Sequence, residues 1–283
     1  MIKESGSLYV VATPIGNLDD ISQRAIQTLS QVALIAAEDT RHTGKLLQYL
    51  GIQARTLALH DHNEKQRAAS IIQKCLAGED VALVSDAGTP LISDPGYSLV
   101  RQCREAGVRV IPVPGPCALI TALCAAGLPT DKFQFIGFLA PKSQQRQNQL
   151  ADVPAGVGTI ICYETARRIK GSLTDISVVL GSDRELVLAK ELTKTFEHFV
   201  HGTAAEITAW LDEDPLRCQG EMVLMIAPAA KTEAEISETA QKTLRLLLNE
   251  LPVKKAAALT ADIHNEKKNA LYKLALQWAG ENE

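Results

Sequence analysis

Residues 1–113 alternate short apolar runs with stretches of helical periodicity, and this alternation restricts the possible folds more than any other feature of the sequence. The apolar runs are residues 8–12, 32–37, 56–59, 81–85 and 108–113. The helical stretches lie between them, near residues 21–31, 42–50, 65–77 and 97–106. Apolar strands that alternate with helices are typical of a parallel sheet covered on both faces. The pattern therefore predicts an α/β domain over residues 1–116.

The spacing of the apolar runs changes beyond residue 116. Six runs follow closely upon one another, at residues 133–138, 159–164, 176–180, 185–192, 196–202 and 221–227. Closely spaced strands with few helices between them favour a mixed sheet. We therefore expect a second α/β domain over residues 117–230.

Three helical segments follow Pro228. The apolar stripes of the first and third comprise Ile236, Ala240, Leu244, Leu247, Leu248 and Leu251, and Leu271, Leu274, Ala275 and Trp278. Pro252 can begin the second helix, because proline is favoured in the first turn. We expect a small helical domain over residues 231–283. Its last two helices fit either a helix-turn-helix or a cap that serves only dimerisation or stability.

The composition is that of a globular protein and excludes several other classes. The chain is 46% hydrophobic and 22% charged, with a formal net charge of −4, which excludes a disordered tail, a collagen-like repeat and a histone-like wrapper. Aromatic residues make up only 4%, so we expect no row of aromatic side chains that stacks on single-stranded bases. The six cysteines match no common zinc spacing, and no metal site is expected.

One uncharged stretch, Val110 to Thr130, is about as long as a membrane-spanning helix. Prolines and glycines at positions 112, 114–116, 127 and 129 cannot continue a helix, which leaves a short apolar helix over Cys117–Ala126. The N-terminus shows no basic segment followed by a long apolar one. We therefore expect a cytoplasmic protein without a membrane partner.

Ligand-binding residues are expected in the loops after the strands of the first domain, because open parallel sheets bind ligands at the carboxyl ends of their strands. Neither a G-x-G-x-x-G segment after a strand nor a Walker A segment is present. Four loops are rich in polar or small residues: VATPIGNLDD (11–20), AEDTRHT (37–43), LHDHNE (59–64) and VSDAGTPLISDPG (84–96). A fifth segment, residues 114–116, leads into a helix N-terminus whose free N–H groups suit a carboxylate or phosphate.

Each loop also has a purely structural interpretation. Helix caps and a surface ion pair account for part of the charge in residues 37–43. The two histidines of residues 59–64 fit a capping loop, a metal site or substrate handling. Residues 84–96 fit a long turn with two Asx caps, or a backbone that approaches a polar ligand closely.

Taken together, these segments resemble the signature segments of bacterial small-subunit ribosomal RNA cytidine 2′-O-methyltransferases, within the tetrapyrrole methylase superfamily. The segments are VATPIGNLDDI, AEDTRHT, LHDHNE, VSDAGTPLISDPG, VPGPCALITAL and GLPTDKFQFIGFLAPK, and the resemblance extends from about residue 7 to residue 228. The segment LPVKKAAALTADIHNEKKNALYKLAL resembles the helix-turn-helix tail of many members.

The resemblance implies a two-domain tetrapyrrole-methylase-like (class III methyltransferase) fold with a small C-terminal helical domain. It implies a homodimer that binds S-adenosylmethionine in the cleft between its α/β domains. The implied reaction is methylation of the ribose 2′-hydroxyl of a cytidine in 16S ribosomal RNA, within the small ribosomal subunit and near the decoding region. No metal or DNA is implied. Two alternatives remain open: a methylase of tetrapyrrole precursors, and a non-catalytic RNA-binding or assembly protein.

The resemblance also implies which residues contact the donor. They are Pro14, Ile15, Gly16, Ser85, Asp86, Ala87, Cys117, Ala118, Tyr163, Glu164, Leu188 and Met222. The first of these segments reads V-A-T-P-I-G-N, whereas relatives that bind tetrapyrroles have V-G-x-G-P-G-D. We therefore expect the backbone of this loop to differ.

Methyl transfer to a ribose hydroxyl benefits from a base, or from a charge that stabilises the alkoxide, because the pKa of the hydroxyl lies far above 7. The candidates are Glu38, Asp39, His60, His62, Glu164 and Lys142. Asp39 and His60 are the first choices, because both lie in loops at the same sheet edge as Asp86. Lys142 could act by lowering the pKa of the hydroxyl.

RNA contacts must come from local charge, because the net charge of the chain is −4. Residues 142–170 contain five basic and two acidic residues, a net +3, whereas residues 252–283 contain five basic and four acidic residues, a net +1. The expected phosphate contacts are Arg41, Lys142, Arg146, Arg167 and Arg168. A solvated surface would give the same pattern. We expect the RNA to be recognised by shape rather than by aromatic stacking.

Overall fold

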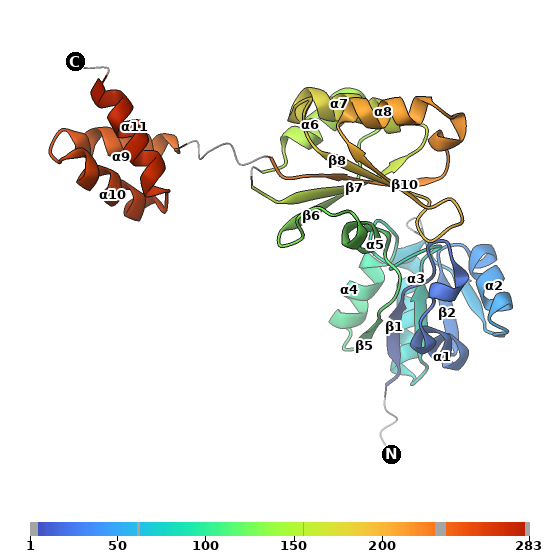
Figure 1. The fold of residues 1–283 in the computed structure, drawn as a ribbon. Helices are drawn as coiled ribbons and strands as arrows, with labels where there is room; N and C mark the ends of the chain where they lie inside the picture. Colours follow the sequence, from blue (N-terminus) through green and yellow to red (C-terminus); the bar gives the residue numbers. More distant parts are fainter. Residues whose placement is uncertain (1–4, 61–62, 155, 230–235, 281–283) are drawn as a thin grey trace. The chain divides into compact units, whose positions relative to one another are not determined.

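The computed structural model describes residues 5–60, 63–154, 156–229 and 236–280. The chain forms two compact units, Met1–Pro228 and Ala229–Glu283 (Figure 1). The first unit contains two five-stranded sheets, and the second contains three helices within the residues that the structure describes.

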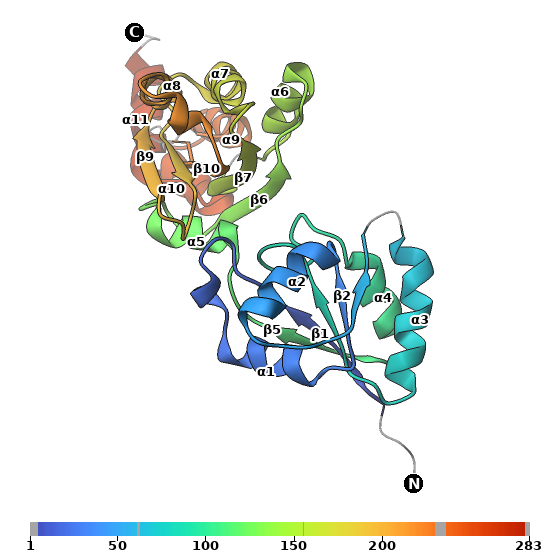
Figure 2. The same cartoon turned by 90° about the vertical axis from the view of Figure 1, so that its right-hand side faces the viewer.

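The first sheet is parallel throughout, with the strand order β3-β2-β4-β1-β5. Its strands are β1 (Ser7–Val11), β2 (Leu34–Ala37), β3 (Thr56–Ala58), β4 (Val81–Val84) and β5 (Arg109–Val113). One face is covered by α1 (Gln23–Gln31) and α2 (Thr40–Tyr49), and the other by α3 (Glu64–Leu76) and α4 (Tyr97–Glu105) (Figure 2). Strands β2 and β4 are buried along their whole length, which explains their continuous apolar runs. The predicted parallel α/β fold is confirmed.

The chain leaves the neighbouring strands β1 and β4 in opposite directions. β1 leads to β2 beyond β4, whereas β4 leads to β5 beyond β1. Open α/β sheets bind ligands at such a reversal, outside the carboxyl ends of the strands. The two loops are joined by Thr13 and Gly88, which exchange backbone hydrogen bonds of 2.8 and 3.0 Å. Gly88 has a φ of 80°, a conformation that glycine adopts without strain.

The second sheet is mixed, as predicted, with the order β6-β7-β10-β8-β9. Only β6 and β7 pair in parallel, and the other neighbours are antiparallel. Its strands are β6 (Phe133–Phe138), β7 (Thr159–Thr165), β8 (Leu186–Lys190), β9 (His198–Gly202) and β10 (Glu221–Ile226). Helices α6 (Ser143–Ala151), α7 (Ile169–Leu180) and α8 (Ala204–Asp212) cover one face, and α5 (Ala118–Ala125) packs on the other (Figure 1). The predicted domain boundary at residue 116 lies between β5 and α5 and stays a prediction.

The strand predicted over residues 176–180 is wrong, because this segment forms the last turns of α7. Ile169, Leu173 and Ile176 are fully buried at helical spacing in the core beneath the sheet's helices. Val178 is 68% exposed, as expected on the outer face of a helix. The β-branched residues of this run favour a strand, but packing of the helical stripe overrides that preference. Gly181, with a φ of 103°, follows the helix end.

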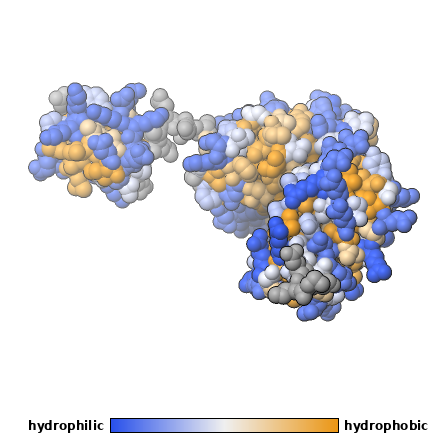
Figure 3. Space-filling view, turned by 90° about the horizontal axis from the view of Figure 1, so that it is seen from below, coloured by the Kyte–Doolittle hydropathy of each residue, from blue (hydrophilic) through white to orange (hydrophobic). Residues whose placement is uncertain are grey.

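The C-terminal unit consists of α9 (Glu238–Leu248), α10 (Val253–His264) and α11 (Lys268–Gly280). The three predicted helices are confirmed, and Pro252 immediately precedes α10. The small core of the unit comprises Ile236, Ala240, Leu244, Ala256, Ala257, Ala261, Leu271 and Ala275. Apolar side chains also reach its surface, as Figure 3 shows for one face. Within the described residues, no helix of either unit combines the length and apolar character that crossing a membrane requires.

Candidate functional site

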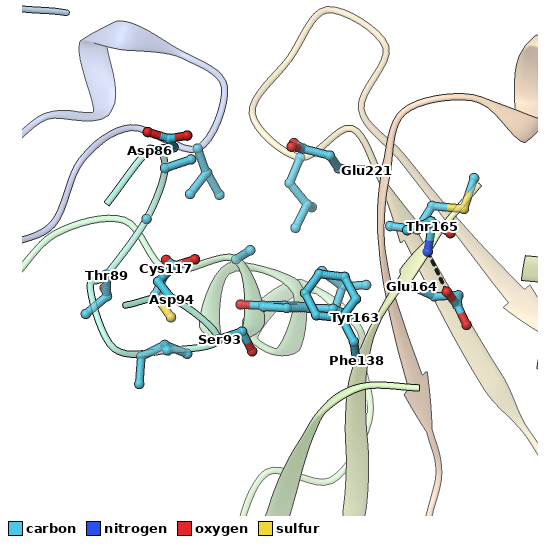
Figure 4. A pocket seen from close by; sticks show the side chains of 18 of the residues that line it. Asp86, Thr89, Ser93, Asp94, Cys117, Phe138, Tyr163, Glu164, Thr165 and Glu221 are labelled. Carbon is cyan, nitrogen blue, oxygen red and sulfur yellow. Dashed lines mark hydrogen bonds between the residues drawn. The ribbon is translucent and has the colours of Figure 1, made fainter. Parts of the chain in front are cut away.

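A cavity of about 420 Å³ lies where the carboxyl ends of strands from both sheets meet (Figure 4). The first sheet contributes the loops that follow β1, β2 and β4. The second sheet contributes the ends of β6 and β7, the loop after β8 and the start of β10, and α5 begins at the same place. Cavities of this size and position typically bind small molecules. The position agrees with the chain reversal at β1 and β4.

Asp86, in the loop after β4, has a carboxylate that the backbone anchors in the cavity wall. Its Oδ1 accepts a hydrogen bond from the N–H of Asp39 at 3.0 Å. Its own N–H donates to Oε2 of Glu38 at 3.3 Å. Backbone groups at the ends of β2 and β4 therefore hold the carboxylates of Asp86 and Glu38 side by side in the wall.

Backbone strain concentrates in two loops of the cavity wall. Of the five non-glycine residues with positive φ among those described, four lie in the loops of residues 86–96 and 191–194. They are Leu91 (74°), Ser93 (67°), Glu191 (51°) and Thr193 (63°). Such conformations persist only where surrounding contacts impose them, and they cluster at ligand sites.

The N-terminus of α5 and the side chain of Tyr163 form another part of the wall. Cys117 precedes α5 without a side-chain hydrogen bond to the first turn, so the helix directs backbone N–H groups towards the cavity. The Tyr163 hydroxyl points towards Cys117 and Asp94 (Figure 4). Burial, together with these two acidic groups, raises the pKa of Tyr163 to about 12. The phenol is therefore neutral at physiological pH and can donate a hydrogen bond.

The wall is acidic. Its charged residues are Glu38, Asp86, Asp94, Glu164 and Glu221, and no Lys, Arg or His belongs to it among the described residues. The carboxylate of Glu221 pairs with Lys194 at 2.7 Å, and that of Glu164 points away from the cavity (Figure 4). Because carboxylates outnumber cations in the described wall, the cavity is favourable for a cationic ligand that also carries hydrogen-bond donors.

Most of the predicted donor-binding residues lie in this wall, but four do not. Those in the wall are Ile15, Asp86, Ala87, Cys117, Ala118, Tyr163, Glu164 and Met222. Pro14 is buried beside it, and a Cβ on Gly16 would lie 2.6 Å from Cγ of Lys194, so Gly16 packs against the loop after β8. Ser85 is buried, and its hydroxyl donates to the carbonyl of Ala87.

The prediction for Leu188 is wrong. Successive side chains of a strand point to opposite faces, and Leu188 is fully buried in the core between β8 and α6–α8. Its neighbours Val187 and Ala189 face α5 instead. Leu188 is therefore on the side of the sheet away from α5, and it is not among the residues that line the cavity.

The residues predicted for catalysis, Asp39, His60 and Lys142, do not line the cavity. Asp39 caps α2, and the Arg41 guanidinium, 2.7 Å away, holds the pKa of its carboxyl well below its usual range, which makes it a poor base. The ring of His60 lies 3.0 Å from the amide nitrogen of Asn63. Lys142 is exposed at the start of α6.

The other catalytic candidates have different outcomes. His62 lies outside the described residues. The Glu164 carboxylate is buried and accepts hydrogen bonds from the Thr165 N–H, the Arg168 guanidinium and the Ser172 hydroxyl. It therefore holds the start of α7. Among the predicted candidates that the structure describes, Glu38 and Glu164 line the cavity, and the Glu38 carboxylate accepts the Asp86 N–H there.

The prediction that Arg146 contacts RNA is wrong, because its side chain is 6% exposed and pairs with Asp175. Arg168 is 20% exposed and pairs with Glu164. Arg41 pairs with Asp39 but is 88% exposed. Lys142 and Arg167 are exposed at the ends of loops that follow β6 and β7. Lys142 and Arg167 therefore lie on the same edge of the second sheet as the cavity.

Asp94, Phe138 and Glu221 also line the cavity, although none of the three was predicted as a site residue. Asp94 belongs to residues 84–96, one of the loops expected to contain ligand-binding residues. Gly137 within the apolar run 133–138 was a signal for an irregular strand. Within the described residues, no group of three or more His, Cys, Asp or Glu side chains could hold a metal ion.

The chain is similar to known methyltransferases. The family model described as Tetrapyrrole (Corrin/Porphyrin) Methylases matches residues 7–208, and that of the RsmI C-terminal HTH domain matches residues 234–279. The Ribosomal RNA small subunit methyltransferase I of Escherichia coli O157:H7 is 57% identical over 275 residues, 97% of this chain and 96% of that protein.

Two solved structures share the fold. The methyltransferase CobJ has a TM-score of 0.60 at 18% identity and covers 81% of this chain and 97% of its own. A uroporphyrin-III C-methyl transferase from Thermus thermophilus, complexed with S-adenyl homocysteine, has a TM-score of 0.53 at 16% identity and covers 78% of this chain and 97% of its own. At these identities the similarity shows the fold alone.

Proposed function

The chain belongs to the tetrapyrrole methylase family, and from this premise we propose that it methylates small-subunit ribosomal RNA with S-adenosylmethionine as the donor. The acceptor is the ribose 2′-hydroxyl of a cytidine in 16S RNA near the decoding region, within the small subunit. We propose a cytoplasmic homodimer as the active form. The 57% identical relative named as a small-subunit methyltransferase and the acidic cavity carry the proposal.

The cavity fits the chemistry of the donor. S-adenosylmethionine carries a sulfonium, an ammonium and two ribose hydroxyls, for which the carboxylates of Asp86 and Asp94 are suitable partners. The first turn of α5 suits its carboxylate, and Ile15 and Ile92 supply apolar surface for its adenine. When bound, the donor supplies an electrophilic methyl group. The chain's own residues orient the acceptor hydroxyl, exclude water and take up its proton.

We propose that Glu38, rather than Asp39 or His60, takes up the hydroxyl proton. Glu38→Gln keeps an oxygen that accepts the Asp86 N–H but removes the base, and we expect single-turnover methylation to slow about 100-fold at saturating donor. Asp39→Asn is the matched control, because asparagine also caps a helix, and we expect less than a threefold change. Equal losses in the two variants would contradict this assignment.

Lys142 and Arg167 are the proposed phosphate contacts. RNA affinity falls as the salt concentration rises, and a plot of log affinity against log salt concentration is steeper when more cations contact phosphates. We expect Lys142→Ala and Arg167→Ala each to reduce the slope by about 1, measured by filter binding of 16S RNA between 50 and 200 mM salt. Lys65→Ala, an exposed cation on α3, should leave it unchanged. Unchanged slopes in the first two variants would count against an RNA surface at this sheet edge.

The decisive test of the function is a map of ribose methylation in 16S RNA from cells that lack this protein. We expect mass spectrometry to show the loss of one 2′-O-methylcytidine, which the wild-type gene restores. An unchanged map would overturn the proposal. Calorimetry with S-adenosylmethionine then separates the alternatives, since a non-catalytic assembly protein would not bind it and a tetrapyrrole methylase would.

A further inference from the structure

Strand β6 contains a bulge at its cavity end. Phe133 pairs with Thr159 and Phe135 with Ile161, two residues apart on each strand. The next pair is Phe138 with Tyr163, so β6 advances three residues where β7 advances two. Gly137 has a φ of 70°, which a residue with a side chain adopts only with strain. Such bulges re-aim side chains beside functional sites.

The extra residue decides which way Phe138 points. In a regular strand, Phe133 and Phe135 would share one face and Phe138 would lie on the opposite face, under the helices. With the bulge, Phe138 is opposite Tyr163 and on its face. The two rings meet edge to face, with centroids 5.5 Å apart and planes at 66°. Figure 4 shows Phe138 beside Tyr163 at the cavity.

The ring of Phe138 lines the cavity and yet is 51% exposed. The edge-to-face contact fixes the ring without covering both of its faces. Two exposed cations belong to the loops that follow these paired strands: Lys142 lies four residues after Phe138 in the loop after β6, and Arg167 lies in the loop after β7. An oriented aromatic ring at a sheet edge whose loops carry exposed cations is suited to hold an unstacked base and its phosphates.

We propose that Phe138 stacks on the base of the acceptor nucleotide and so places its ribose at the cavity. This inference rests on the proposed function. A ribose hydroxyl can enter a cavity only if its nucleotide leaves the stack of its neighbours, and an aromatic ring at the entrance replaces part of the lost stacking. One ring is sufficient for this purpose, so the 4% aromatic content excludes a row of stacking side chains but not this contact.

The test compares Phe138→Ala with Phe138→Trp, using small ribosomal subunits from cells that lack the protein. We expect Phe138→Ala to lower kcat/KM for the subunit about 5- to 100-fold, the range that loss of one stacked base gives. Phe138→Trp should keep at least half of the activity. Because Phe138 also lines the donor cavity, some loss of affinity for S-adenosylmethionine is expected in Phe138→Ala, but calorimetry should show a smaller fold-change than that in kcat/KM. Phe133→Ala is the matched control, because Phe133 is 43% exposed at the far end of β6.

Three outcomes would overturn the inference, and they are distinguishable. If Phe138→Ala methylates subunits as the wild type does, the ring has no role in the acceptor complex. If Phe138→Ala weakens donor binding as much as it lowers kcat/KM, the ring contacts the donor instead. If wild-type protein binds the donor but leaves the subunits unmethylated, the proposed function fails and the inference fails with it.

Discussion

Replacing Asp86 by alanine should weaken the binding of S-adenosylmethionine about 10- to 100-fold, as measured by calorimetry. Hydrogen bonds to a charged group contribute about 1.5–3 kcal/mol, which corresponds to this range. Asp86 is expected to have this effect because it lies where the loops after β1 and β4 diverge and because the Asp39 N–H fixes its carboxylate. Methylation of ribosomal subunits should fall at least as far.

Asp86→Asn separates the charge of Asp86 from its anchoring role. The amide oxygen can still accept the Asp39 N–H, so the loop should keep its shape while the negative charge is lost. We expect an affinity between those of the wild type and Asp86→Ala. Asp131→Ala, an exposed carboxylate ahead of β6, serves as the control and should bind normally. Wild-type affinity in Asp86→Ala would show that the donor lies elsewhere.

The parts of the fold that could be predicted are those with a local physical signature. Strands β2 and β4 are buried on both faces, so each residue had to be apolar and the run was visible in the sequence. The strand predicted over residues 176–180 was wrong, because a short apolar run fits a strand or a buried helix equally well. The decisive stripe began further back, at Ile169 and Leu173, in a segment for which no helix was predicted.

Residues of the candidate site likewise divide into those with a local signature in the sequence and those without one. Asp86 and Ala87 reach the cavity because they follow a parallel strand, and every such loop ends at the same sheet edge. The prediction for Leu188 is wrong because the face on which a strand residue lies cannot be known before the register of β8 is known. Phe138 was missed for the same reason, since a bulge exists only relative to the partner strand. Site residues on strands are therefore hard to predict from sequence, because a shift of one residue in the pairing register changes which side chains face the cavity.

Arg146 shows a further limit, because charge counting cannot reveal a tertiary partner. Its guanidinium donates to Oδ2 of Asp175 at 2.7 Å and to the carbonyl of Ala140 at 3.0 Å. Oδ1 of Asp175 accepts from the Ser143 hydroxyl and the Gln147 amide, both at 2.7 Å. Burial alone would raise the pKa of Asp175, but these hydrogen bonds and the Arg146 charge outweigh it and lower the pKa below its usual range. The pair joins α6 to α7 in the ionised form.

Replacing Arg146 by alanine should therefore lower the free energy of unfolding by about 3–5 kcal/mol, measured with urea at pH 7, because a buried carboxylate is left without its partner. The salt dependence of RNA binding should stay unchanged at a temperature where the variant is folded, in contrast to Lys142→Ala and Arg167→Ala.

A double variant tests whether the lost stability comes from the stranded charge. Arg146→Met combined with Asp175→Leu removes both charges and keeps apolar volume, so we expect it to recover most of the stability. Because the pKa of Asp175 is lowered in the folded protein, the pair stabilises above about pH 4, and its contribution is lost as the pH falls through the folded pKa. The gap between wild type and Arg146→Ala should therefore narrow in acid. A gap that stays constant from pH 7 to pH 3 would show that the lost stability does not come from the ionised pair. An Arg146→Ala variant with wild-type stability and a reduced salt slope would instead place Arg146 on the RNA surface.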